Sequence, residues 1–261
     1  MSFTGKSPAD TYKDILNIDN SNSGVDSTAR IVESGNGSET AISLSDRSLY
    51  VKSNTNNSKA LNVANSAGST KFNVDTTNNQ VKALGHHVNT QYAYFGIGFD
   101  AQALLAANTH YAIPFFGMVN KISMWDVDFG TGTDPDTSFT TANTVSQYGS
   151  QLAGMLWYVP DNISIDGVYS IEGADAATGD TTRMHLYSYT FNSGSTSALA
   201  DGTLLAHNSA VTNAGNEQAY LSTWTVDSAN VSGGKVVCAF FRSDSNNSDY
   251  TTNITVKYHL T

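Results

Sequence analysis

Residues 40–84 repeat a pattern in which two apolar residues flank a single residue and are followed by a polar turn. The pairs are Ile42/Leu44, Leu49/Val51, Leu61/Val63, Phe72/Val74 and Val81/Ala83. Residues two apart in an extended chain point to the same side, so each pair predicts a short strand with one apolar face. Such a strand is not stable by itself, and identical copies of the chain are the simplest source of its missing contacts. We therefore expect a repetitive, oligomeric β stalk or mount over residues 29–88.

The segments between these pairs are rich in Asn, Ser, Gly and Thr, as in residues 54–57 and 65–68. Asn and Gly accept the positive φ angles that tight hairpins require. The pairs begin at residues 42, 49, 61, 72 and 81, so their spacing is irregular. This irregularity favours a β-meander or a small β-prism over a solenoid.

The first 28 residues form a separate N-terminal segment. Ser7 and Pro8 are typical of a helix start, and a short helix is predicted over residues 8–17. An amphipathic terminal helix of this kind could seat the protein on a larger body, or it could fold back on its own domain. The residues that we expect to dock are Tyr12, Ile15, Leu16 and Ile18.

Residues 89–261 contain longer and more aromatic apolar runs. The expected strands are 91–99, 111–116, 121–129, 152–159, 167–171, 183–191, 202–207, 220–226, 235–242 and 250–260. Strands at this spacing, joined by Gly, Asn and Asp loops, predict an antiparallel β-sandwich of the jelly-roll type. A two-turn helix over residues 101–108 would cover one end of the sandwich. Residues 183–191 are apolar on both faces, which indicates that the outer face meets a neighbouring subunit.

The composition excludes several classes of protein. Charged residues make up 14% of the chain, and 13 Lys and Arg against 23 Asp and Glu give a net charge of −10. Nucleic acid is not expected as a partner, because phosphate neutralisation requires clustered cations. No apolar run has signal-peptide length at the N-terminus or approaches the roughly 20 residues that span a bilayer, so a membrane is not expected either. A structural protein of a virion or of the extracellular space fits better than a cytosolic enzyme.

An acidic loop is the most suggestive candidate for a metal site. Asp126 and Asp128 share one side of a predicted strand, and nearby glycines could fold Asp134 and Asp136 back towards them. Four carboxylates in this arrangement would suit Ca²⁺, although their spacing is not that of an EF-hand. The alternative is a solvated hairpin tip whose Asp residues stabilise turns.

Other reactive residue types have simpler explanations. Cys238 lies in an apolar run and is interpreted as a small buried hydrophobe. The carboxylate pairs Glu172/Asp175 and Asp161/Asp166 could serve a glycosidase, but surface charge is the commoner role. Several aromatic residues could form a sugar-binding platform, although packing in a core or an interface is favoured: Trp125, Trp157, Trp224, Tyr158, Tyr169, Tyr187 and Tyr189. We therefore expect no catalytic residues and, apart from the candidate calcium site, no cofactor.

Two stretches carry a resemblance to a known family. Residues 12–28 and 72–83, the second followed by residues 88–96, are similar to the N-terminal regions of structural proteins from marine tailed bacteriophages of the cyanophage or pelagiphage type. The resemblance covers about the first hundred residues. It implies a place in the virion and a homotrimer, in which six residues would pack between chains: Ile42, Leu44, Leu61, Val63, Phe72 and Val74.

The resemblance leaves the location in the virion open. A repetitive region under a hundred residues is short for a tail fibre, which favours a capsid decoration protein of the cement or head-fibre type on the outer capsid surface. Its partner would then be the major capsid protein or another virion protein. The alternatives are a tail fibre that binds a receptor or host surface glycans, and a polysaccharide depolymerase spike.

Overall fold

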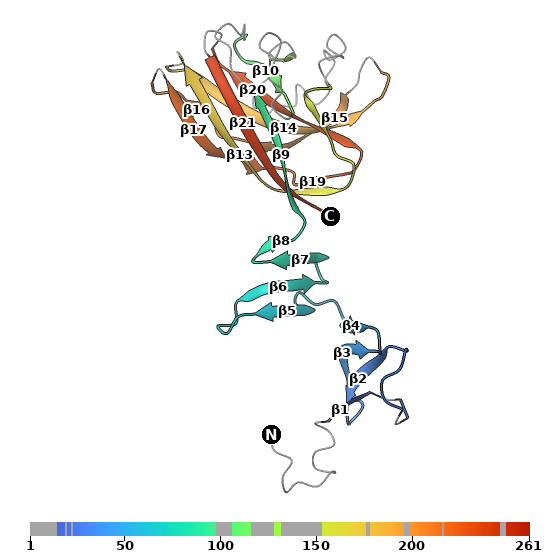
Figure 1. Ribbon diagram of the computed structural model, residues 1–261. Helices are drawn as coiled ribbons and strands as arrows, with labels where there is room; N and C mark the ends of the chain where they lie inside the picture. Colours follow the sequence, from blue (N-terminus) through green and yellow to red (C-terminus); the bar gives the residue numbers. More distant parts are fainter. Residues whose placement is uncertain are drawn as a thin grey trace. The chain divides into compact units, whose positions relative to one another are not determined.

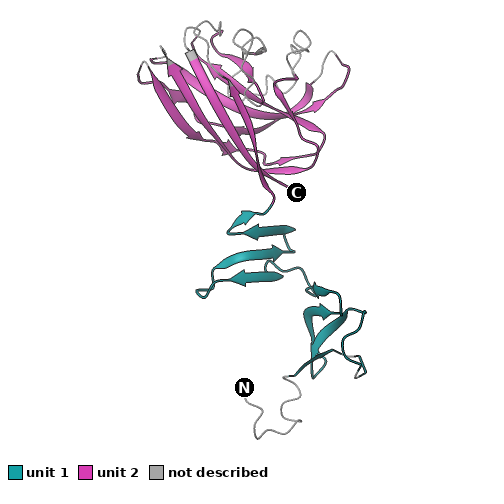
Figure 2. Ribbon diagram, in the orientation of Figure 1, with its two compact units in different colours: residues 1–88 teal, residues 89–261 magenta. Residues whose placement is uncertain are grey.

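The structure is a computed structural model that describes residues 15–18, 20–21, 23–97, 106–115, 128–131, 153–175, 178–195, 199–215, 217–245 and 249–261. All regular structure within these ranges is β, arranged in antiparallel sheets, and none of it is helical. No described helix could therefore span a membrane. The chain divides into two compact units, Met1–Val88 and Asn89–Thr261 (Figure 2).

Unit 1 contains two four-stranded meanders, in which strands adjacent in sequence are adjacent in the sheet (Figure 1). The first comprises β1 (Leu16–Ile18), β2 (Arg30–Ser34), β3 (Glu39–Leu44) and β4 (Leu49–Val51). The second comprises β5 (Leu61–Ala64), β6 (Thr70–Asp75), β7 (Gln80–Ala83) and β8 (His86–His87). Gly37 and Gly68 occupy hairpin turns with φ of 78° and 80°, which residues with a Cβ rarely adopt.

The predicted N-terminal helix is wrong where it can be compared with the structure. Leu16 and Asn17 belong to β1, and Leu16 lies opposite Ser34 of β2. Pairing with a strand distant in sequence outweighs the weak helical preference of so short a segment. Residues 8–14 of the predicted helix lie outside the described residues.

Unit 2 is built from two antiparallel sheets. The eight-stranded sheet has the order β11 (Asp128–Thr131), β10 (Thr109–Ile113), β20 (Lys235–Ser243), β14 (Thr181–Phe191), β15 (Leu199–His207) and β18 (Thr225–Val226), with β12 (Leu156–Tyr158) on β20 and β16 (Val211–Thr212) on β14. The five-stranded sheet has the order β17 (Gln218–Thr223), β13 (Ile163–Asp175), β21 (Asp249–Leu260) and β9 (Thr90–Ile97), with β19 (Asn230–Val231) on β13.

The main core lies between these two sheets, as expected for a sandwich. The five-stranded sheet contributes Phe95, Val168 and Ile254, and the eight-stranded sheet contributes Met184, Leu205 and Phe241. Trp157 and Trp224 are also buried in this cluster, so they pack in the core as favoured from the sequence. The all-β, sandwich-like class is therefore confirmed, whereas the jelly-roll connectivity stays a prediction.

A second apolar cluster covers the other face of the eight-stranded sheet. Tyr187 and Tyr189 are buried there against Phe240, Phe129 and Met155 of the same chain. The expectation that this face of residues 183–191 meets a neighbouring subunit is therefore wrong for these tyrosines. Because both faces are covered, the central strand β20 is apolar almost throughout.

The short helix predicted over residues 101–108 is also absent from the described residues of that range. Residues 106–108 precede β10 without helical structure, and residues 101–105 lie outside the described ranges. The backbone N–H of Ala106 donates a hydrogen bond of 2.7 Å to the hydroxyl of Tyr111. This bond ties the turn to the strand that follows.

Candidate functional site

The sheet β5–β8 places six apolar side chains on one face. Leu61 lies opposite Val74, and Val63 lies opposite Phe72. β7 continues both rows, with Val81 opposite Val74 and Ala83 opposite Phe72. Residues directly opposite each other in antiparallel strands project to the same side. The apolar face of β5–β8 is therefore Leu61, Val63, Phe72, Val74, Val81 and Ala83.

The opposite face of the same sheet is polar. Asn62 lies opposite Asn73, which in turn lies opposite Lys82, and His87 follows on β8. Alternation of this kind is typical of a sheet with one face in water and the other against an apolar layer.

Unit 1 contains no such apolar layer within its described residues. Val63 keeps 53% of its surface exposed, and Leu61 keeps 40%. Between residues 15 and 88, the only buried side chain in the described ranges is the polar Asp75. A single-layer sheet with an open apolar face lacks the packing that ordinarily stabilises a small β structure. The face is therefore a candidate surface for self-association.

The sheet β1–β4 carries a smaller patch of the same type. Ile42 lies opposite Val51, and Leu44 lies opposite Leu49. Ile42, Val51 and Leu49 are exposed, and Leu44 is half-buried. All six residues predicted to pack in a trimer thus lie on sheet faces that the described chain leaves open.

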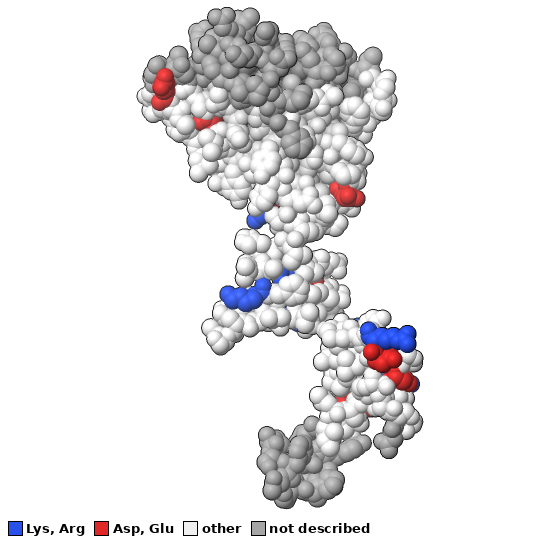
Figure 3. All heavy atoms as spheres, viewed as in Figure 1, with Lys and Arg blue, Asp and Glu red and all other residues white. Residues whose placement is uncertain are grey.

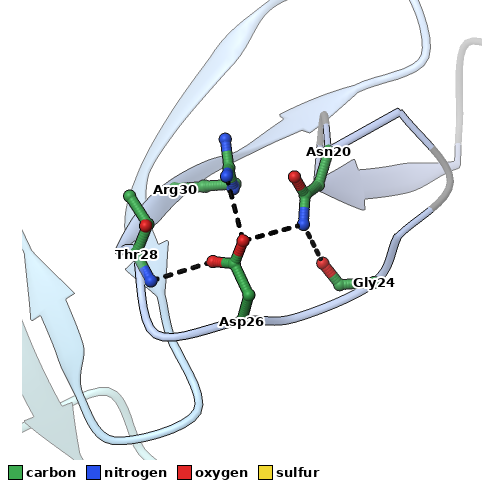
Figure 4. A network of polar contacts seen from close by, with 5 residues as sticks. All are labelled: Asn20, Gly24, Asp26, Thr28 and Arg30. Atoms are coloured by element: carbon green, nitrogen blue, oxygen red, sulfur yellow. Dashed lines mark hydrogen bonds and ion pairs between the residues drawn. The ribbon is translucent and has the colours of Figure 1, made fainter.

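A polar network fixes the loop between β1 and β2 (Figure 4). Asp26 accepts hydrogen bonds from the backbone N–H of Thr28 at 2.8 Å and from Nη2 of Arg30 at 3.0 Å. Nδ2 of Asn20 contacts the same carboxylate at 3.3 Å and the carbonyl oxygen of Gly24 at 2.7 Å. The bonds from Arg30 and Thr28 hold the pKa of Asp26 below its ordinary value. The loop is therefore tied to the start of β2.

Three of the four predicted docking residues lie within the described part of the chain. Leu16 is 65% exposed and Ile15 is 42% exposed, whereas Ile18 is half-buried. Tyr12 lies outside the described residues. Exposed apolar side chains at Ile15 and Leu16 are available for contact, and docking to a capsid stays a prediction.

The calcium prediction falls almost entirely on undescribed chain. Asp126, Asp134 and Asp136 lie outside the described residues. Asp128 is the first residue of β11, where the backbone alone is described. The candidate calcium site stays a sequence-based prediction.

Glu172 is the buried carboxyl group that sequence reasoning missed. Surface charge is its predicted role, but it is 4% exposed and lies inside the sandwich. Burial raises its pKa to about 7, and a hydrogen bond from Thr182 opposes this rise. The proposed second member of its pair, Asp175, ends β13 and its side chain is not described.

Cys238 and the pair Asp161/Asp166 are the remaining candidate reactive groups. Cys238 is fully buried, and burial raises the pKa of its thiol, which opposes formation of a nucleophilic thiolate. In the other carboxylate pair, Asp166 lies 3.0 Å from Nδ1 of His259, and Asp161 is exposed. These contacts assemble no constellation of nucleophile and base.

The described surface carries few charges. In the view of Figure 3, lysine, arginine and acidic side chains are scattered over a largely uncharged surface. This agrees with the 14% of charged residues in the sequence. A surface of this kind offers no dense cationic patch on the side shown.

No protein-family model matches the sequence, and no curated protein matches it significantly. Among solved structures, an aminopeptidase from the marine sediment archaeon Thaumarchaeota archaeon aligns with 72% of this chain at 9% identity and a TM-score of 0.33. The chain spans 40% of the length of that aminopeptidase. A TM-score of this size establishes neither a shared fold nor a shared activity.

Proposed function

We propose that the chain is a non-enzymatic structural protein of a bacteriophage virion, most specifically a homotrimeric capsid decoration protein of the cement or head-fibre type. The observation that carries the proposal is the open apolar face of β5–β8 opposite a polar face. Such a sheet is complete only when copies cover one another's apolar faces. The place in the virion is supported by the resemblance of residues 12–28 and 72–96 to phage structural proteins.

Three chains form the assembly that best suits these short sheets. Three one-sided sheets can surround a common axis with their apolar faces inward and their polar faces in water. The side chains of Leu61, Val63 and Phe72 would then form the dry interior of a small β-prism. Unit 2 has its own core and would be displayed by this mount.

Native mass tests the assembly. Light scattering on the full chain should give three times the chain mass of 27.8 kDa. Val63→Asp places a carboxylate on the apolar face and should abolish the trimer. Asn62→Asp, the matched control, adds the same group to the polar face of the same strand and should preserve it. A monomeric native protein, or a trimeric Val63→Asp variant, would contradict the proposal.

The N-terminal segment is proposed to attach the trimer to the particle. Deletion of residues 1–26 should abolish binding to particles that lack the protein, while the trimer mass is retained. The expected partner is the major capsid protein or another protein of the outer surface. Undiminished particle binding after the deletion would overturn the docking role.

The main alternative is a tail fibre or a carbohydrate-binding protein for host adsorption. Exposed tyrosines on β9 and β13, namely Tyr92, Tyr94 and Tyr169, favour it because aromatic rings stack on sugars. Quantitative mass spectrometry of virions distinguishes a capsid decoration protein from a tail protein by its copy number. A copy number comparable to that of the major capsid protein supports decoration, and a far smaller number supports a tail location.

A further inference from the structure

The five-stranded sheet of unit 2 has a second apolar surface on the side that faces away from the core. Its strands alternate, so that Ala93 and Phe95 of β9 enter the core whereas Tyr92 and Tyr94 project outward. The outer face is defined here by five residues: Tyr92, Tyr94, Tyr169, Ile171 and Leu221.

The strand register brings these side chains into adjacent rows. Tyr94 lies opposite Thr255, and Thr255 lies opposite Tyr169. In the next row, Ile171 lies directly opposite Leu221. Leu221 is 78% exposed and Ile171 is 57% exposed, values that describe a surface rather than a core. The outer face thus carries large apolar side chains on β9, β13 and β17, with the polar Thr255 and Asn253 of β21 between those of β9 and β13.

Two glycines of β13, Gly167 and Gly173, lie on the same face. A Cβ at Gly167 would lie 2.8 Å from the hydroxyl oxygen of Tyr169, so the tyrosine ring extends over the glycine. Gly173, on the same side of β13, would likewise place a Cβ 2.8 Å from Oγ1 of Thr251. Because glycine has no side chain, these two positions permit the close approach of another sheet face.

The charge pattern favours a second copy of the same chain as the occupant. The chain carries 23 acidic residues and a net charge of −10, so contacts between copies are opposed by repulsion. The rows that contain Tyr94, Ile171 and Leu221 have Thr255 and Asn253 between them, and the row of Tyr92 contains Lys257, so these three rows hold no carboxylate. Two copies can meet here without bringing carboxylates together.

The covalent connection to unit 1 supports the same occupant. Only Val88 and Asn89 separate His87, the last residue of β8, from Thr90, the first residue of β9. Three Cα–Cα steps limit this distance to about 11 Å in any arrangement of the units. If copies associate through β5–β8, the β9 strands of neighbouring copies are therefore held near one another.

We propose that the outer face packs against unit 2 of a second copy of this chain. This inference rests on the proposed assembly through unit 1, and it adds a second interface that would fix the displayed sandwiches in one arrangement. The contact would shield the side chains of Tyr92, Tyr94 and Tyr169 from solvent.

Tyrosine nitration of the full-length native protein, read by peptide mass spectrometry, tests the contact. Tyr92, Tyr94 and Tyr169 should react on the order of tenfold more slowly than Tyr158, because an interface core excludes water. Tyr158 is the internal reference, since it is 60% exposed in unit 2 and lies on β12 of the other sheet.

A variant pair completes the experiment. Leu221→Asp alters an exposed side chain, so the fold should persist, and it should raise nitration of the three tyrosines to the rate of Tyr158. Phe191→Asp, the matched control at an exposed position of the eight-stranded sheet, keeps Tyr158 as the reference and should leave the protection of the three tyrosines unchanged. The native mass of Leu221→Asp should remain that of the assembly formed through unit 1.

The outcomes separate this interface from the proposed assembly. A monomeric native protein would overturn the assembly and this interface with it. A multi-chain protein whose Tyr92, Tyr94 and Tyr169 react as fast as Tyr158 would overturn the interface alone. Protection that appears only on addition of a host polysaccharide would assign the face to a glycan instead.

Discussion

Thr182 on β14 donates a hydrogen bond of 3.0 Å from Oγ1 to Oε2 of Glu172 on β13. The bond joins the two sheets of the sandwich, and both side chains are buried. A carboxyl group in this position is most stable when it is protonated, because burial disfavours its charge.

The buried Glu172 should make the stability of unit 2 depend on pH. Its pKa rises from 4.5 to about 7 on folding. Between these values the folded state holds more protons than the unfolded state, so stability falls as pH rises through this window. The loss should be at most about 3 kcal/mol, from the shift and the usual energy per pKa unit.

Urea unfolding of wild type and Glu172→Gln, followed by tryptophan fluorescence at pH 5 and pH 8, measures this effect. The variant should be the more stable protein at pH 8 and should lose most of the pH dependence. Glu217→Gln, at an exposed position of the same unit, is the control and should behave as wild type. Equal pH dependence in wild type and Glu172→Gln would refute the prediction.

Trp224 and Ser170 should be energetically coupled. Nε1 of Trp224 donates a hydrogen bond of 2.9 Å to Oγ of Ser170, and both residues are buried. Ser170→Ala should cost about 1–3 kcal/mol, because the indole N–H would lose its acceptor. In a double-mutant cycle with Trp224→Phe, the combined loss should be smaller than the sum of the single losses. Strict additivity would mean that the bond contributes nothing measurable.

Asp75 should titrate below its ordinary pKa. Its Oδ1 accepts hydrogen bonds from the backbone N–H groups of Thr77 and Asn78, and its Oδ2 accepts one from Nδ2 of Asn78 at 2.8 Å. The Asn78 side chain is the largest cause of the lowered pKa, followed by its backbone N–H. The stability that this group contributes is present near neutral pH and is lost as pH falls through the lowered pKa.

Carbon-detected NMR titration of the Asp75 carboxyl group checks this expectation. Asn78→Ala should raise the measured pKa towards the ordinary value of 3.8. Asn62→Ala, on the polar face of the same sheet, should leave it unchanged. An ordinary pKa in the unmodified protein would show that the turn does not hold the carboxylate.

Cys238 should be inert until the protein unfolds. Its thiol is fully buried, and burial raises its pKa, so both access and thiolate formation are suppressed. Ellman's reagent should give no reaction with native protein and a full equivalent in guanidinium chloride. Rapid reaction in native conditions would require exposure of β20, which the fold does not allow.

The strands were more predictable than the helices. The apolar runs 183–191, 235–242 and 250–260 correspond to β14, β20 and β21, because burial demands a long apolar stretch. The helix predicted over residues 8–17 is wrong at Leu16 and Asn17, since capping signals are local and cannot detect that Leu16–Ile18 pairs with β2.

The burial of Glu172 has a signal in the sequence. Val168, Ser170 and Glu172 occupy every second position of β13, and Val168 is apolar. Residues two apart share a face, so Glu172 follows Val168 into the core. The polar character of Ser170 and Glu172 obscured this pattern.

The sequence by itself determined that the chain forms short strands with one apolar face in unit 1 and long strands in unit 2. Side-chain alternation is a local property, because successive residues of a strand point to opposite sides. Only the tertiary structure decided that β20 lies between β10 and β14, that Glu172 meets Thr182, and that Tyr187 is covered by its own chain. These outcomes depend on which distant strands pair and on which layer covers each face, and a local pattern specifies neither.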